Sequence, residues 1–325
     1  MRQLPVLSAI VLSRSDYGAI RRLMRHLRAQ TARSCMELIF VVPQAKGFQP
    51  NPDEMAEFWG WQILECGRID LTSRPRTLGV HAARAPLVVF TEEHCLPFPD
   101  WAEALIAAHE NEWAVVGPVV YNANPRTAMS WAQFFLEYGI WLAPHEGGDA
   151  EILPGNNSCY RRELLLELGD RLEQMLDAET LLHWEFRRRG LRLRLEPKAR
   201  AYHINMTQWR PFLLTAFHAG RRFAHHRALG WGAARRMVYF CGSPLIPAIR
   251  FRRILAEIRR TGRTGMLARI LPPLGLSLIA SAFGEMQGYL GVLGQSREYL
   301  AEIELDRERL LGPGDAVEIP DPPAR

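Results

Sequence analysis

The first hundred residues alternate between short apolar runs and amphipathic segments, and this alternation restricts the fold more than any other feature of the chain. Helical periodicity predicts helices at residues 17–30 and at about 78–85. Strands that alternate with helices pair in parallel through right-handed crossovers. The sequence therefore predicts an α/β sheet of the nucleotide-binding type. The apolar runs predict its strands at Leu7–Ser13, Glu37–Val42, Trp61–Glu65 and Leu87–Phe90.

Two carboxylates and an imidazole follow the fourth predicted strand, at Glu92, Glu93 and His94. Pro97 and Pro99 come next and predict that neither strand nor helix continues. Open α/β sheets bind ligands at the carboxyl ends of their strands, which is where these three side chains would lie. Oxygen and nitrogen donors suit a divalent cation, which could neutralise a phosphate-bearing ligand. The alternative is an acidic turn that is simply solvated.

The turn after the first strand, Ser13-Arg14-Ser15-Asp16, argues against two common nucleotide sites. A dinucleotide-binding oxidoreductase would have G-x-G-x-x-G here, because glycine lets the backbone approach the pyrophosphate closely. A P-loop is missing for the same reason. A cation near the two acids and His94 is then the available way to hold phosphates, and this favours a sugar nucleotide over NAD or ATP.

Six segments along the first two thirds of the chain resemble family 2 glycosyltransferases of the GT-A fold, in particular the inverting, bacterial membrane-associated type. Their common order makes the resemblance specific. The segments are the opening strand and helix (8–31), an Arg-x-x-Gly-x-x-x-Ala run (76–83), the acidic turn with Pro-x-Pro-x-Trp (90–101), an acceptor-side Gly-x-Asn and Arg-Arg run (154–162), an acidic helix start (177–190) and Pro-x-Ala-x-x-x-His (197–203).

The resemblance implies a GT-A mixed sheet flanked by helices, followed by a helical membrane-associated region. It implies a hexosyltransferase-type enzyme of polysaccharide biosynthesis that moves a sugar from a nucleotide-diphosphate donor to a lipid-linked or glycan acceptor, with Mn²⁺ or Mg²⁺ bound. The acceptor hydroxyl must lose a proton as it attacks, and direct displacement inverts the anomeric centre. The implied roles are Glu179 as catalytic base; Ser13, Arg14, Arg76, Glu92 and Glu93 at the donor; Asn157, Arg161 and Arg162 on the acceptor side; and Glu92, His94 and His203 at the metal.

The chain departs from the family pattern in three places. The family's Asp-x-Asp falls on Glu92 and His94, and an imidazole suits Mn²⁺ better than Mg²⁺. Pro43 stands where an acidic residue usually contacts the nucleobase, so the base preference stays open. Ala178-Glu179 replaces Glu-Asp and keeps one carboxylate. A catalytically degenerate nucleotide-sugar-binding module of the same fold is therefore the alternative function.

The expected site residues also have purely structural interpretations. His203 could be a core histidine, Arg161 and Arg162 could begin a solvated helix, and Glu179 could be a first-turn acid favoured by the helix dipole. Aromatic residues between 131 and 141 recur at helical spacing, which predicts packing rather than a sugar-binding platform.

The character of the chain changes after residue 204. Twelve arginines and one acidic residue lie between residues 204 and 263. Two charge-free runs accompany them, Met237–Ile249 and Ile270–Gly284, and neither reaches the roughly 20 residues of a membrane span. Prolines should also interrupt a straight helix in each run, namely Pro244 and Pro247 in the first and Pro272 and Pro273 in the second.

Short apolar helices edged with arginine fit an anchor on an anionic cytoplasmic leaflet. We therefore expect a protein at the cytoplasmic face of a membrane, bound peripherally, as a re-entrant element or as a shallow integral one. Nucleic-acid binding is not expected, because the arginines frame apolar runs instead of covering a polar surface. The alternative is an apolar hairpin used for dimerisation, so a homo-oligomer stays open.

These patterns divide the chain into a GT-A glycosyltransferase domain (1–206), a basic and apolar helical membrane-associated region (207–294) and a polar tail (295–325). The tail should begin as a charged helix and end in a disordered, proline-rich segment. The opening residues predict a strand rather than a signal peptide, because Arg14 and Asp16 follow at once. The five cysteines are widely spaced and include no C-x-x-C pair, which argues against disulfides or structural zinc and fits a reducing compartment.

Overall fold

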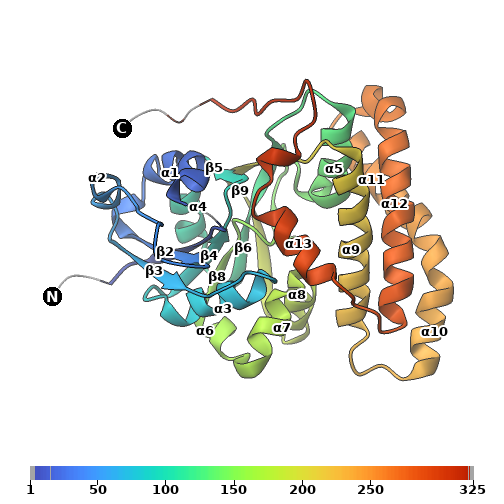
Figure 1. Ribbon diagram of the computed structural model, residues 1–325, viewed down its shortest axis with the longest axis horizontal. Helices are drawn as coiled ribbons and strands as arrows, with labels where there is room; N and C mark the ends of the chain where they lie inside the picture. Colours follow the sequence, from blue (N-terminus) through green and yellow to red (C-terminus); the bar gives the residue numbers. More distant parts are fainter. Residues whose placement is uncertain (1–3, 15, 321, 323–325) are drawn as a thin grey trace. The chain divides into compact units, whose positions relative to one another are not determined.

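The computed structural model describes residues 4–14, 16–320 and 322 (Figure 1). The chain forms two compact units. The first comprises Met1–Tyr121, Ala143–His203 and Ile319–Arg325, and the second comprises Asn122–Leu142 and Ile204–Glu318. The second unit therefore includes residues 122–142, which lie inside the first domain expected from the sequence, and it includes most of the expected tail.

Within the described residues, nine strands form one mixed sheet. Its hydrogen-bonded order is β3-β2-β1-β4-β8-β6-β9-β5, and β7 pairs with β9. The four predicted strands are confirmed to within one residue, whereas β5 was not expected. It ends at Pro97 at one end of the strand order, where a proline is tolerated. The strands are β1 (Leu7–Leu12), β2 (Met36–Val42), β3 (Gly60–Glu65), β4 (Leu87–Thr91), β5 (Cys95–Pro97), β6 (Trp113–Asn122), β7 (Gly148–Ala150), β8 (Cys159–Arg161) and β9 (Arg192–His203).

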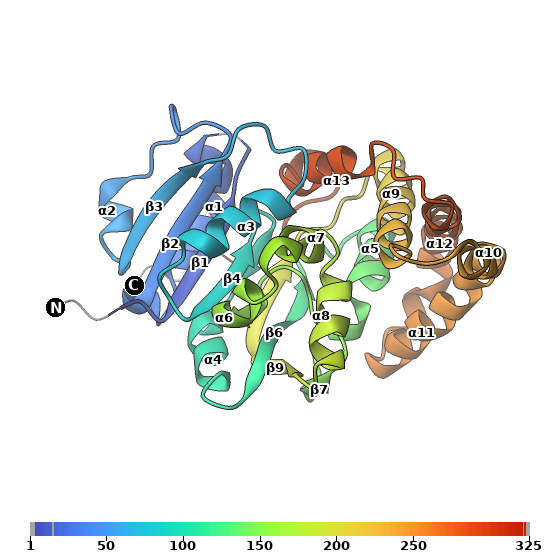
Figure 2. The ribbon, with the colours of Figure 1, turned by 90° about the horizontal axis from the view of Figure 1, so that it is seen from below.

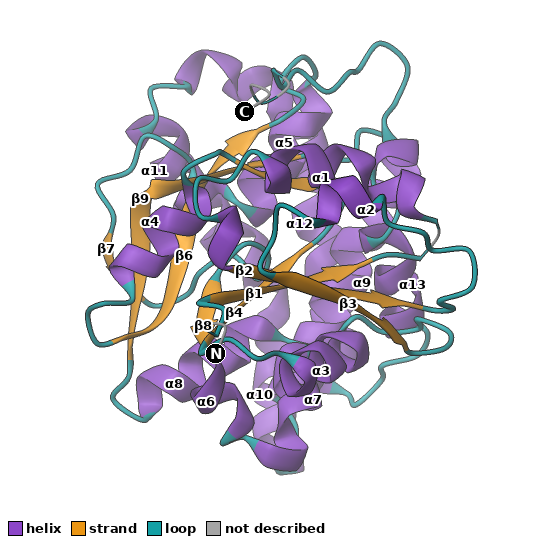
Figure 3. Cartoon of the chain, turned by 90° about the vertical axis from the view of Figure 1, so that its left-hand side faces the viewer, coloured by secondary structure: helices purple, strands orange, loops and turns teal. Residues whose placement is uncertain are grey.

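The first four strands form the parallel part of the sheet, and Figure 2 shows them side by side. Ile10 in β1 lies opposite Ile39 in β2 and Phe90 in β4. Every residue of these three strands is buried, which is why their sequences are largely apolar rather than alternating. The buried Ser8 and Glu37 are polar, and the Ser8 hydroxyl donates to Glu37 Oε2 at 2.7 Å. The helices α1 (Arg21–Arg28) and α3 (Ser73–Ala82) lie on opposite faces of the sheet (Figure 3). The predicted parallel crossovers are confirmed.

The remaining helices of the first unit are α2 (Pro52–Met55), α4 (Trp101–Ala108), α6 (Arg162–Leu166), α7 (Leu172–Leu176) and α8 (Glu179–Arg188). The helix predicted at about 78–85 begins earlier than expected, because α3 starts at Ser73. Pro75 is tolerated there, since the first backbone N–H groups of a helix have no intrahelical partner. The earlier start places Arg76 on the helix instead of before it.

The second unit is helical, with α5 (Ala128–Glu137), α9 (Trp209–Arg227), α10 (Ala233–Gly242), α11 (Ile246–Arg260), α12 (Leu267–Tyr289) and α13 (Ser296–Glu304). Pro244 and Pro247 fall at the junction of α10 and α11, so the predicted interruption is confirmed. The prediction was wrong for Pro272 and Pro273, because α12 continues through both. Thr264–Tyr289 is the one helical stretch in the described part of the chain whose length and apolar composition would suffice to cross a membrane.

Close packing against α9 explains why α12 stays helical through its prolines. The two helices lie side by side in Figures 1 and 2. A Cβ atom added to Gly220 would lie 2.3 Å from the backbone oxygen of Ser281, and one added to Gly284 would lie 2.0 Å from that of Phe217. The two backbones therefore touch at glycines, and this packing offsets the backbone hydrogen bonds that the prolines cannot make.

Candidate functional site

The candidate site begins with Glu92, where β4 ends. This residue is fully buried, and its two carboxylate oxygens have different partners. Arg76 Nη2 donates to Glu92 Oε1 at 2.7 Å, and Asn156 Nδ2 donates to Glu92 Oε2 at 2.9 Å. Arg76 Nη2 also donates to Asn156 Oδ1 at 2.9 Å, so the three side chains close a ring of hydrogen bonds. The structure brings together Arg76 and Glu92, which the sequence analysis had assigned to the donor.

Arg76 also reaches Glu179, the expected catalytic base. Its Nη1 donates to Glu179 Oε1, which forms a second ion pair on the other branch of the guanidinium group. Burial opposes the positive charge of Arg76, but the carboxylates of Glu179 and Glu92 outweigh burial and raise the pKa of Arg76 above its ordinary value. Arg76 is therefore a permanent cation between two carboxylates.

The two carboxylates differ in accessibility. Glu179 is the first residue of α8, and its side chain is 21% exposed, whereas that of Glu92 is 0% exposed. The loop before β8 passes close to Glu179, because a Cβ atom on Gly155 would lie 2.9 Å from Glu179 Oε1. Of the pair, Glu179 is the carboxylate that a substrate can reach.

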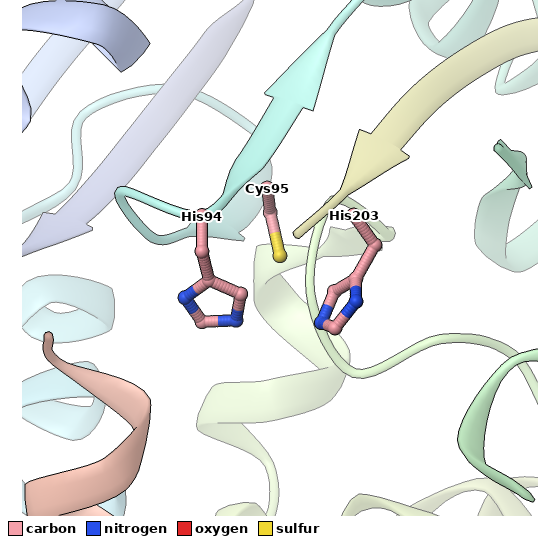
Figure 4. Close-up of side chains that lie close together, drawn as sticks. All are labelled: His94, Cys95 and His203. Atoms are coloured by element: carbon pink, nitrogen blue, oxygen red, sulfur yellow. The ribbon is translucent and has the colours of Figure 1, made fainter. Parts of the chain in front are cut away.

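A second group of side chains, His94, Cys95 and His203, lies next to Glu92 (Figure 4). One ring nitrogen of each imidazole and the Sγ atom of Cys95 all lie within 4.8 Å of one another, and all three residues are buried. His94 Nε2 is 3.7 Å from Glu92 Oε2, and His94 Nδ1 is 3.6 Å from Glu93 Oε1. Imidazole, thiolate and carboxylate are all metal ligands, so this group could hold a divalent cation.

Backbone geometry assembles this group from two strands and a turn. The backbone N–H of Cys95 donates to the backbone carbonyl oxygen of Glu92 at 3.0 Å and closes the turn that contains His94. Antiparallel pairing of β5 with β9 then puts Cys95 opposite His203, and opposite residues of such a pair point to the same side. Stacking of Phe98 on Tyr202, with ring centroids 4.5 Å apart, supports this register.

Ser13, Arg14 and Glu93 lie at the same edge of the sheet as Glu92. Ser13 follows β1 and is buried, and its backbone N–H donates to the carbonyl oxygen of Val41 at 3.2 Å. Arg14 is exposed. Because β1 and β4 are parallel neighbours in register, Ser13 and Glu93 each follow their strand at an equivalent position. The structure thus places these three predicted residues around the carboxyl ends of β1 and β4.

Asn157 is held by its backbone. Its φ of 62° is left-handed, a conformation that asparagine tolerates better than most residues. Its N–H donates to the Phe90 oxygen at 2.7 Å, and its own carbonyl accepts from Trp101 Nε1 at 3.2 Å. The neighbouring Asn156, which the sequence analysis missed, is the residue that binds Glu92. No sequence signal separates two adjacent asparagines, because the choice depends on the backbone conformation.

Arg161 and Arg162 donate to backbone carbonyl groups. Two of these carbonyls end α3, the helix that carries Arg76, so Arg162 satisfies helix-terminal acceptors. The structure uses both guanidinium groups to fasten loops and does not bring them to Glu92. The acceptors of Arg161 are Trp113, His109 and Asn111, and those of Arg162 are Val80 and His81.

His183 supports the helix that carries Glu179, and the sequence analysis did not select it. Its Nδ1 accepts from the Leu153 N–H at 3.3 Å, so Nε2 carries the proton and donates to the Tyr160 hydroxyl at 3.0 Å. Burial lowers the pKa of His183 to about 3, so the ring is neutral. His183 therefore fastens α8 to β8. The one signal in the sequence is its position four residues after Glu179, on the same helical face.

No protein-family model matches the chain, and no curated protein matches its sequence. The structure is similar to that of the mannosyltransferase PcManGT from Pyrobaculum calidifontis, solved in complex with GDP-Man and Mn²⁺. The TM-score is 0.56 at 16% sequence identity, over 87% of this chain and 88% of that chain. It is also similar to GalNAc-T7, solved with UDP, GalNAc and Mn²⁺. There the TM-score is 0.51 at 14% identity, over 75% of this chain and 51% of that one, about half of its length.

At sequence identities this low, the structural similarity shows the fold and nothing more. The mixed sheet flanked by helices is the GT-A glycosyltransferase fold, and the predicted fold class is confirmed.

Proposed function

We propose that this protein is a glycosyltransferase that moves a sugar from a nucleotide-diphosphate donor to a lipid-linked or glycan acceptor. The observation that carries the proposal is the pair of ion pairs through which Arg76 links Glu92 to Glu179, at the carboxyl end of β4 in a GT-A fold. Open α/β sheets bind their ligands at this edge. Both similar structures were solved with a nucleotide or a nucleotide sugar and with Mn²⁺.

Glu179 is the proposed catalytic base. The acceptor hydroxyl would give its proton to Glu179 as its oxygen attacks the anomeric carbon of the sugar. The nucleoside diphosphate would leave from the opposite face, so the anomeric centre would be inverted. Glu92 is less suited to this role, because it is fully buried and both of its oxygens already accept hydrogen bonds.

Arg76 is the proposed counter-charge for the reaction. Its neighbours keep it a cation, and a fixed positive charge next to a departing diphosphate stabilises the negative charge that develops there. The same side chain orients Glu179 through their ion pair. Asn156 in turn holds Glu92 and Arg76 in place.

A divalent metal ion held by Glu92, His94 and His203 would neutralise the diphosphate of the donor. The residues fit such an ion. The two imidazole rings pack edge to face with ring centroids 5.0 Å apart, and His94 Nε2 lies 3.7 Å from Glu92 Oε2. Two nitrogens and one carboxylate suit Mn²⁺ better than Mg²⁺, which prefers oxygen ligands.

Membrane docking by the second unit is part of the same proposal, because it would bring the enzyme to a lipid-linked acceptor at the cytoplasmic face. Apolar side chains on α10, α11, α12 and the turn Ser243–Leu245 are 45% to 69% exposed. Exposed arginines accompany them and would attract anionic headgroups. The apolar residues are Met237, Val238, Leu245, Ile249, Leu271, Leu276, Ile279 and Phe283, and the arginines are Arg235, Arg252, Arg253 and Arg269.

Calorimetric titration with uridine, guanosine and thymidine diphosphates, each with and without Mn²⁺, tests the donor assignment. We expect at least one diphosphate to bind, and to bind more tightly with the metal. Glu179→Gln should retain that binding and reduce sugar transfer by roughly 10²- to 10⁴-fold, the usual contribution of a general base. If none of the three diphosphates binds under either condition, the donor assignment fails. Co-sedimentation with lipid vesicles is the matching test of membrane docking. We expect the protein to sediment with anionic but not with zwitterionic vesicles, and failure to sediment with either kind would refute the docking.

A nucleotide-sugar-binding module without catalysis is the second candidate, and one observation favours it. An oxygen of Glu179, the expected base, already accepts from the Arg76 guanidinium. A module would bind the donor without turnover under any metal, and Glu179→Gln would change nothing. A large loss of transfer in that variant would exclude the module.

A further inference from the structure

Cys95 lies among the expected metal ligands, although the sequence analysis assigned it no role. Its Sγ atom and one nitrogen each of His94 and His203 lie within 4.8 Å of one another. Figure 4 shows the sulfur atom between the two imidazole rings. We propose that Cys95 is a thiolate ligand of this site, and that it makes the site select thiophilic ions of the Zn²⁺ and Co²⁺ kind. The inference rests on the metal site of the proposed function but requires no sugar transfer.

The position of the thiol is a consequence of the backbone rather than of side-chain rotation alone. The turn is closed by the hydrogen bond from the Cys95 N–H to the backbone carbonyl oxygen of Glu92, and it fixes the start of β5. The register of β5 with β9 then places Cys95 opposite His203. Cys95 is 2% exposed, so the thiol faces the rings and not bulk solvent. A ligand fixed in this way loses little conformational entropy when a metal binds.

Three of the other four cysteines have surroundings that differ from those of Cys95. The thiols of Cys35 and Cys66 donate to the backbone oxygens of Ala32 and Val42, at 3.1 and 3.3 Å. Cys241 is exposed on α10. In the part of the chain that the structure describes, Cys95 is the cysteine that belongs to a group of metal-ligand side chains. Its environment, and not the general burial of cysteine, points to a ligand role.

The ligand chemistry decides which cation such a site would select. Imidazole and thiolate together are a ligand set of the type found in protein zinc sites. Thiolate is a soft ligand that favours Zn²⁺ and Co²⁺, whereas Mg²⁺ and Mn²⁺ favour oxygen. On binding, the Cys95 S–H bond breaks, the sulfur keeps the electron pair and donates it to the metal, and the proton passes to solvent.

Titration of the metal-free full-length protein with Co²⁺, without any nucleotide, tests the inference by absorption spectroscopy. We expect a thiolate-to-cobalt charge-transfer band in the wild type, and we expect the band to disappear when added Zn²⁺ displaces the Co²⁺. Cys95→Ser should lose the band, and its affinity for Co²⁺ and Zn²⁺ should fall by at least about tenfold, while its affinity for Mn²⁺ changes much less. Cys241→Ser is the control for adventitious binding to an exposed thiol, and it should keep the band.

Three results would overturn the inference: Co²⁺ does not bind to the wild type or binds without a charge-transfer band, the band persists in Cys95→Ser, or the band is lost in Cys241→Ser. Absence of the band from the wild type refutes the inference even if Cys95→Ser fails to fold. Because no nucleotide is present, failure here leaves the diphosphate titrations intact. Failure of those titrations likewise leaves the cobalt band intact, so the two proposals can fail separately.

Discussion

Replacing Arg76 by glutamine removes the cation that Glu92 and Glu179 share. Glu92 is fully buried and would lose its ion pair at 2.7 Å while keeping the hydrogen bond from Asn156. Removing one partner of a buried ion pair typically costs about 3–5 kcal/mol, because the other charge stays in a medium of low dielectric constant. The lost ion pair with Glu179 adds less to the loss of stability, since water screens the partly exposed carboxylate of Glu179. We therefore expect Arg76→Gln to lower the free energy of unfolding by about 3–5 kcal/mol.

Urea denaturation followed by circular dichroism measures this loss, and hydrogen exchange of the β4 amides assigns it to the site. Adding Glu92→Gln to Arg76→Gln should recover about 1–3 kcal/mol, because a neutral amide needs no cation beside it. The matched control is Arg28→Gln. Arg28 also bridges two acids, Glu54 and Glu57, but its side chain is 37% exposed, so we expect a change of at most about 1 kcal/mol. Equal effects of Arg76→Gln and Arg28→Gln, or no recovery in the double variant, would refute the reasoning.

Two further predictions concern stability. Because burial lowers the pKa of His183 from 6.5 to about 3, the unfolded chain binds a proton that the folded chain does not, so the free energy of unfolding should fall by roughly 1.4 kcal/mol per pH unit as the pH drops below 6.5 toward 3. Urea midpoints at several pH values should show a shallower fall for His183→Gln, and an identical slope would contradict this. Gly284→Ala should cost about 1–3 kcal/mol, since its Cβ would lie 2.0 Å from the Phe217 oxygen. Gly275→Ala in the same helix meets nothing within 4 Å and should be neutral or stabilising in thermal unfolding, so equal effects would contradict the packing argument.

The parallel strands could be predicted because burial on both faces leaves a visible mark on the sequence. In β1, β2 and β4 every residue is buried, and the runs are correspondingly rich in apolar residues. The edge strand β5 could not be predicted in this way. It has three residues, ends in Pro97, and is a strand only because β9 lies beside it.

Prolines were informative only where local structure decides the outcome. Pro244 and Pro247 mark a helix junction, as expected, whereas Pro272 and Pro273 lie inside α12. The difference is the contact of α12 with α9 through glycines such as Gly284, which no local pattern around the prolines reveals. Tertiary packing can outweigh an unfavourable helix propensity.

The candidate site was predictable in its residue types but not in its contacts. Sequence reasoning assigned Arg76 and Glu92 to the donor and Glu179 to catalysis, and the structure joins all three through two ion pairs. It selected Asn157, whereas the side chain that binds Glu92 is Asn156. Contacts such as these depend on how α3, β4 and α8 meet. α3 and β4 are neighbours in the sequence, ending at Ala82 and Thr91, whereas α8 begins only at Glu179.

The sequence by itself determined the four parallel strands, the helices α1 and α3 and the acidic turn after the fourth strand, because burial and turn formation are governed by neighbouring residues. Only the tertiary structure decided that Arg76 is shared by Glu92 and Glu179, and that Cys95 faces His203 across two antiparallel strands. These arrangements depend on strand register and helix position. Both are set by the packing of distant segments, for which a single sequence carries no local signal.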